Sequence, residues 1–265
     1  MFRPIVIGIL TLFSLSLHAQ QTRLALVVGN ADYRGDSLKN PVNDARAVAS
    51  TLRLLGFEVI QRENASLREL IASLQEFSIR ARRSEVRLVY YAGHGVQVKG
   101  RNFLIPIGAE IADEDDVPRK SADVNDLLDR LGDLKSGMNV VILDACRNNP
   151  FNNTPTLNAE GRRIRTRGLL EGQGLAKVSA PNGTLIAYST SPGNVAIDSV
   201  RQANSVYAKH LLANIVTPGI PIEQVFKRVR IAVAQETQNL QIPWETSSLM
   251  GDFCFKSGAG DQCGK

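Results

Sequence analysis

Two short segments of the chain contain a thiol and an imidazole that could act together. Residues 89–95 (VYYAGHG) form an apolar, β-prone run that ends in Gly-His-Gly and contains His94. Residues 140–149 (VVILDACRNN) form a second such run, with Cys146 just after its apolar part. A thiol needs a base to become a nucleophilic thiolate near neutral pH, and imidazole is the usual partner. The pattern predicts nucleophilic catalysis by Cys146 with His94 as the base.

The elements that contain these residues are predicted to be neighbours in a sheet. Each run is short and apolar enough to be a fully buried parallel strand. In each run the reactive residue is expected to lie in the loop at the strand's carboxyl end, which is where open α/β sheets have their functional sites. Apart from His18, the only other histidine is His210, which lies among apolar neighbours in a predicted helix and is interpreted as structural.

The cysteine count also indicates Cys146. The chain has three cysteines, and Cys254 and Cys263 flank a short flexible stretch, Ser-Gly-Ala-Gly. In an oxidising compartment a nearby pair is expected to form a disulfide and an odd cysteine to stay free for chemistry. The alternative is that Cys146 is a buried, inert residue at a strand end.

An oxidising compartment is indicated by residues 1–19. Arg3 precedes an apolar stretch over residues 5–17, and Leu17-His18-Ala19 resembles a signal-peptidase site. The stretch is short for a membrane span, and the alternative is a buried N-terminal helix. We therefore expect an exported protein, periplasmic or secreted, that starts near Gln20 and keeps no stable membrane anchor after signal cleavage.

The net charge of +5 is concentrated in one polar segment. Residues 161–180, named here the arginine loop, include four closely spaced arginines: Arg162, Arg163, Arg165 and Arg167. Such a cluster could bind nucleic acid, but no aromatic residues alternate with the arginines. A solvated, exposed linker is the preferred interpretation, with no nucleic-acid partner.

Apolar periodicity predicts alternating strands and helices. The predicted strands span 23–29, 57–61, 86–92, 139–143 and 184–188, and a hairpin joins 96–98 to 102–105. The predicted helices span 41–55, 66–83, 122–134, 205–215 and 222–237. Asn40 is a candidate N-cap for the helix at 41–55. Ser66 and Glu69 have the spacing of a capping box at the start of the helix at 66–83. That second helix has an apolar stripe formed by Leu67, Leu70, Ile71, Leu74 and Phe77. The alternation predicts an α/β fold with a mostly parallel sheet covered on both faces, in one domain over residues 20–256 with a tail at 257–265.

Residues 91–95 and 144–147 resemble the histidine and cysteine motifs of the caspase, metacaspase and paracaspase superfamily of cysteine peptidases, in a bacterial exported form. His94 and Cys146 are 52 residues apart, against roughly 50 in caspases. The resemblance extends from about residue 23 to about 255. It implies a caspase-like, three-layer α/β/α sandwich, protein or peptide substrates, no required cofactor, and an oxyanion hole formed by the backbone amides of Gly95 and Cys146.

The departures from caspases resemble metacaspases, which cleave after Arg or Lys. Asp144 stands where caspases have Gln, and residues 38–45 resemble the metacaspase segment that adds a second acid, Asp44, to the S1 pocket. A carboxylate pair would bind a guanidinium and repel an acidic P1 residue. Alternatively, Asp44 could favour the first turn of its helix and Asp144 could accept backbone hydrogen bonds.

Two further features follow from the resemblance. The arginine loop lies where caspases are cut into two subunits, so an enzyme with an acidic S1 pocket could cleave itself there. The acidic run at residues 113–116 resembles the calcium site of some metacaspases, although an acidic surface loop is preferred and no metal is assigned.

The expected function is that of a cysteine endopeptidase. A silent caspase-like binding or signalling module and a non-proteolytic thiol acyl hydrolase are the alternatives, and the oligomeric state is left open.

Overall fold

The computed structural model describes residues 21–134, 136–146, 178–191, 196–198, 202–258 and 263, and of Cys146 it describes the backbone. The expected signal peptide at 1–19 and the four arginines of the arginine loop lie outside these residues. Among the described residues, no helix combines the length and apolarity that crossing a membrane requires.

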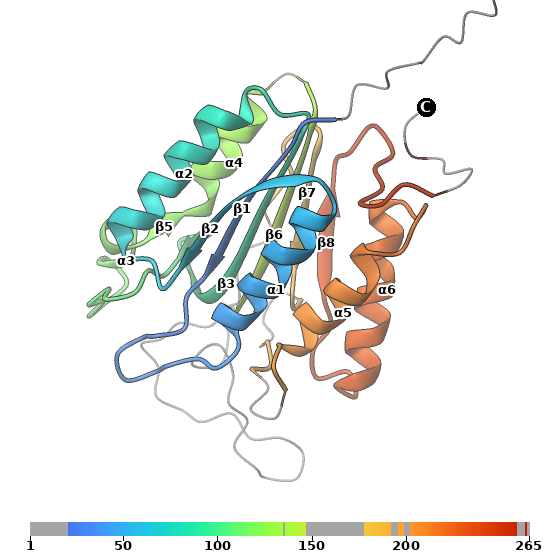
Figure 1. Cartoon of the computed structure of the whole chain (residues 1–265). Coiled ribbons are helices and arrows are strands. Elements are labelled where there is room, and N and C mark those ends of the chain that lie inside the picture. The colour runs from blue at the N-terminus through green and yellow to red at the C-terminus, as the bar shows by residue number, and fades with distance from the viewer. Residues whose placement is uncertain are drawn as a thin grey trace, which may run out of the picture.

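A central sheet runs through the described part of the chain (Figure 1). Its strand order is β2-β1-β3-β6-β7-β8, with β8 antiparallel to β7 and the other neighbours parallel. These strands are β1 (Arg23–Gly29), β2 (Phe57–Glu63), β3 (Val86–Val98), β6 (Met138–Cys146), β7 (Thr184–Tyr188) and β8 (Trp244–Ser247). The predicted parallel sheet is confirmed, and β1 and β7 have the predicted bounds.

Helices cover both faces of the sheet, as Figure 1 shows. One face packs against α2 (Leu67–Ala81) and α4 (Val124–Gly132). The other packs against α1 (Pro41–Leu54), α5 (Val206–Ile215) and α6 (Ile222–Glu236). The result is the expected three-layer sandwich, with a buried apolar core on each side of the sheet.

The observed start of a helix agrees with the prediction where a local N-cap determines it. Ser66 and Glu69 form the predicted reciprocal capping box at the start of α2. Asn40 occupies the N-cap position of α1 but makes no side-chain cap, and its amide group donates to the carbonyl of Gln202. Ile71, expected in the buried stripe of α2, is 41% exposed.

The strand that contains His94 is longer than predicted. β3 continues through Gly-His-Gly to Val98 and then pairs with β4 (Arg101–Leu104), so His94 lies within a strand and not in a loop. Gly93 is required there, because a Cβ would lie 2.7 Å from the Tyr33 hydroxyl. β6 likewise continues through Cys146.

A small layer of further elements surrounds the hairpin. β5 (Ala122–Asp123) pairs with β4, and α3 (Val117–Lys120) precedes it. The helix predicted from residue 122 therefore starts at Val124, because residues 122–123 are extended and the Asp123 side chain caps the helix at the backbone N–H of Asn125.

The C-terminal segment packs on the sheet through buried aromatic residues. Phe253 and Phe255 are buried and lie with ring centroids 5.1 Å apart. Cys254, between them, forms a disulfide with Cys263. The covalent link ties the last described residue of the chain to this buried segment.

Candidate active site

Sheet register places the two predicted catalytic residues side by side. β3 and β6 are parallel neighbours, and His94 is the register partner of Cys146, where the pairing of the two strands ends. Neighbouring strands lie about 4.8 Å apart. The backbone thus holds the imidazole and thiol residues next to each other, although 52 positions separate them in the sequence.

The backbone of His94 is fixed on both sides. Its N–H donates to the Tyr33 hydroxyl at 3.0 Å. Its carbonyl accepts from the Tyr91 hydroxyl at 2.9 Å and from the Ile105 N–H at 3.0 Å. The ring packs against Tyr33, with centroids 4.3 Å apart, and the residue is 8% exposed. A histidine held in this way needs little reorganisation to act as a base.

Asp36 contributes a contact that the sequence did not indicate. The Nε2 atom of His94 lies 3.1 Å from the Asp36 carbonyl oxygen and 3.2 Å from Oδ2 of its carboxylate. Both atoms are acceptors, so in the neutral imidazole Nε2 carries the proton and Nδ1 is the basic nitrogen. The sequence showed Asp36 only as an acid in the loop after the first strand. Such loops converge at the carboxyl edge of the sheet.

The two predicted S1 acids are brought together around one residue. Asp44 on α1 and Asp144 on β6 are both fully buried. Oδ1 of Asp44 accepts from the Ser205 N–H at 2.9 Å and from the Asn204 amide at 3.0 Å. Oδ2 of Asp144 accepts from the Ser205 hydroxyl at 3.0 Å and from the Tyr90 hydroxyl at 3.1 Å. One oxygen of each carboxylate thus accepts two hydrogen bonds, and Ser205 is a donor to both acids.

The pKa of the buried Tyr207 phenol is affected by the nearby Asp144. Burial raises the pKa of the Tyr207 phenol well above its ordinary value, and the charges of Asp144 and Glu245 raise it further. Tyr207 follows shortly after Ser205, in the first turn of α5. The Tyr207 phenol on α5 and the Asp144 carboxylate on β6 are thus both buried and close enough to interact electrostatically.

Asp198 is a third acid in this region that the sequence analysis missed. It is 5% exposed, and its carboxylate accepts from the backbone N–H groups of Lys39 at 2.7 Å and Asn40 at 3.1 Å. These groups lie at the start of α1, one helical turn before Asp44. A carboxylate from a segment distant in sequence thus binds the backbone at the start of α1.

Gly95 is one of the two residues whose backbone amides are predicted to bind the oxyanion. It follows His94 in β3 and pairs with Leu104 of β4. Cys146 is the last residue of β6. The two amides thus belong to adjacent residues of neighbouring strands, and their role in oxyanion binding stays a prediction.

His210 lies on α5, where its Nε2 atom is 2.6 Å from the Glu236 carboxylate of α6. Lys209 donates to the same carboxylate. These contacts link two helices of one layer, which fits the structural role expected for His210.

The acidic run makes local contacts. The backbone N–H of Ala112 and the side chains of Lys120 and Arg119 lower the pKa of Asp116 to about 2. Asp115 pairs with Lys99. Within the described ranges, no group of three or more His, Cys, Asp or Glu side chains is arranged to hold a metal ion. The contacts fit the surface-loop interpretation of this run.

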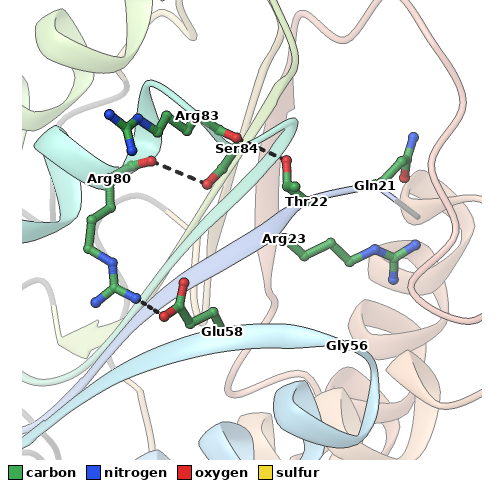
Figure 2. A pocket seen from close by; sticks show the side chains of 8 residues that line it. All are labelled: Gln21, Thr22, Arg23, Gly56, Glu58, Arg80, Arg83 and Ser84. Atoms are coloured by element: carbon green, nitrogen blue, oxygen red, sulfur yellow. Dashed lines mark hydrogen bonds and ion pairs between the residues drawn. The ribbon is translucent and has the colours of Figure 1, made fainter. Parts of the chain in front are cut away.

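A hollow in the described structure lies at the other end of the sheet. Figure 2 shows this hollow, of about 810 Å³, near the amino ends of β1 and β2. Arg23, Glu58 and Arg80 are among its lining residues, and Arg80 pairs with Glu58. The carboxyl ends of the strands, with His94 and Cys146, lie at the opposite edge.

A model of the caspase domain, a peptidase family, matches residues 22–254. The chain belongs to the caspase-domain family. This match covers the whole described sheet and the positions of His94 and Cys146, and it agrees with the three-layer architecture around them.

Curated relatives of this caspase domain come from mammals. Human mucosa-associated lymphoid tissue lymphoma translocation protein 1 is 32% identical over 143 residues, which are 52% of this chain and 17% of the human protein. Rat caspase-1 is 26% identical over 234 residues, which are 84% of this chain and 56% of the rat protein. The chain thus spans less than two thirds of the length of either relative.

Proposed function

We propose that this caspase domain is a cysteine endopeptidase that cleaves after Arg or Lys. Family membership supports peptidase chemistry, and the register of β3 and β6 supports a dyad of Cys146 and His94. The preference for a basic P1 residue rests on one observation: two buried carboxylates, Asp44 and Asp144, bound to the same serine.

In the proposed reaction His94 takes the thiol proton at Nδ1, because Nε2 already donates to Asp36. The Cys146 thiolate attacks the scissile carbonyl carbon, and the amides of Gly95 and Cys146 stabilise the oxyanion. As the tetrahedral intermediate collapses, the C–N bond breaks and His94 protonates the leaving amine. Water, activated by His94, then hydrolyses the thioester and restores the thiol.

The acids account for the proposed specificity. A guanidinium has a planar fork of N–H donors that matches carboxylate oxygens, and its charge offsets the cost of two buried anions. An acidic P1 side chain would add a third negative charge to the pocket. Substrates with P1 Arg or Lys are therefore favoured and P1 Asp is disfavoured.

Export and self-processing complete the proposal. A signal peptide at residues 1–19 would deliver the enzyme to the periplasm or the medium. The arginine loop offers four P1 candidates to the enzyme's own pocket, so we propose cleavage there. No cofactor enters the chemistry, and calcium has no assigned role.

Purified protein tests the function with matched fluorogenic peptides that carry Arg, Lys or Asp at P1. We expect turnover of the Arg and Lys peptides, none of the Asp peptide, and none with the Cys146→Ala variant. Absence of turnover and of thiol labelling would favour a binding module. Turnover of a small thioester without peptide cleavage would favour an acyl hydrolase.

A further inference from the structure

Ser205 contacts both acids of the proposed S1 pocket through different atoms. It is the residue before α5, 1% exposed, and lies far in sequence from both acids. Its backbone N–H donates to Asp44, and its hydroxyl donates to Asp144. One residue thus links a helix on one side of the site to the sheet strand that leads to Cys146.

The direction of the hydroxyl bond is fixed by a third contact. Oγ of Ser205 accepts from the Ala208 N–H at 3.0 Å, the N-cap bond of α5. A serine hydroxyl has one proton, so that proton is left for Asp144. The amino end of α5 also places its positive dipole end beside both carboxylates. Ser205 therefore donates to both acids and links the position of Asp44 to that of Asp144.

We propose that Ser205 is the positioning residue of the acidic pair and makes the pocket prefer Arg to Lys. The inference rests on the proposed cleavage after basic residues. A planar guanidinium can bind two carboxylates at once if their separation is fixed, whereas an ammonium group acts as a point charge. Loss of the link between the acids therefore weakens Arg binding more than Lys binding.

Substitutions at two N-cap serines separate this role from simple capping. Ser205→Ala removes the N-cap of α5 together with the hydrogen bond to Asp144. Ser66→Ala removes the N-cap of α2, on the other face of the sheet, and no contact with either acid. The two losses of capping are similar in kind and cost about 1 kcal/mol each. Ser205→Thr keeps a hydroxyl at the position.

The experiment measures kcat and KM for matched peptides with Arg or Lys at P1, using the full chain as it is produced. The rate of Cys146 alkylation by iodoacetamide and the Tm are measured on the same samples. For Ser205→Ala we expect KM for the Arg peptide to rise about tenfold, since a hydrogen bond to a charged group is lost. The Arg-to-Lys ratio of kcat/KM should fall several-fold, with the alkylation rate within about twofold of wild type.

The controls decide the interpretation. Ser205→Thr should restore the Arg-to-Lys ratio, and Ser66→Ala should leave it unchanged while lowering Tm. An unchanged ratio in Ser205→Ala, or an equal loss for Arg and Lys, would overturn the positioning role and leave the proposed function standing. A wild-type enzyme that cleaves after neither residue would overturn the proposed function itself.

Discussion

Substitution of Asp36 by alanine tests how His94 is oriented. The variant removes the carboxylate 3.2 Å from Nε2 and keeps the carbonyl acceptor of the same residue at 3.1 Å. The imidazole thus retains one acceptor and its tautomer. The Asp36 side chain is 47% exposed, so water screens the lost charge. We expect a loss of about 1 kcal/mol of transition-state stabilisation, or about fivefold in kcat/KM.

The assay is the kcat/KM of the Arg peptide, with Asp32→Ala as the matched control. Asp32 is exposed on the same loop and its loss changes the net charge equally, while its backbone N–H donates to the Asn64 side chain. The control should keep wild-type kcat/KM. An Asp36→Ala enzyme with unchanged kcat/KM would refute a role for the carboxylate. A loss above a thousandfold would refute the idea that the carbonyl holds the ring.

Three further predictions concern the acids, the disulfide and the arginine loop. Asp44→Ala and Asp144→Ala should each lower kcat/KM for Arg and Lys peptides about ten- to a hundredfold, and an equal loss for a neutral P1 peptide would indicate damaged folding instead. Mass spectrometry without reduction should find Cys254 and Cys263 linked, and two free thiols would contradict the bridge. Incubated wild-type protein should acquire new N-termini after arginines of the arginine loop, and the same fragments from Cys146→Ala protein would indicate a contaminating protease.

The sequence predicted those parts of the structure that local patterns determine. The apolar runs before Gly-His-Gly and Asp-Ala-Cys gave two buried strands, and parallel pairing then brings their carboxyl ends together. The capping box at Ser66 set the start of α2 because both of its hydrogen bonds are local. Asp44 and Asp144 were found through resemblance to metacaspases.

Contacts between distant segments could not be predicted in this way. Ser205 and Asp198 reach Asp44, Asp144 and the start of α1 only because the segment before α5 folds across the end of the sheet. The Asn40 amide donates to a carbonyl of that same segment, and its expected local cap does not form. β3 extends through His94 by pairing with β6 and then continues from Gly95 to Val98 by pairing with β4. Apolar periodicity alone divides this segment into a strand and a separate hairpin.

The central claim is that Cys146 is a nucleophile activated by His94 next to a pocket for basic residues. Labelling with an arginyl chloromethylketone, followed by peptide mapping, tests it most directly. We expect one label, on Cys146, with displacement of chloride by the thiolate, and little labelling in His94→Ala or with an aspartyl analogue. Labelling at another residue, or equal labelling by the arginyl and aspartyl reagents, would contradict a Cys146 nucleophile beside a pocket for basic residues.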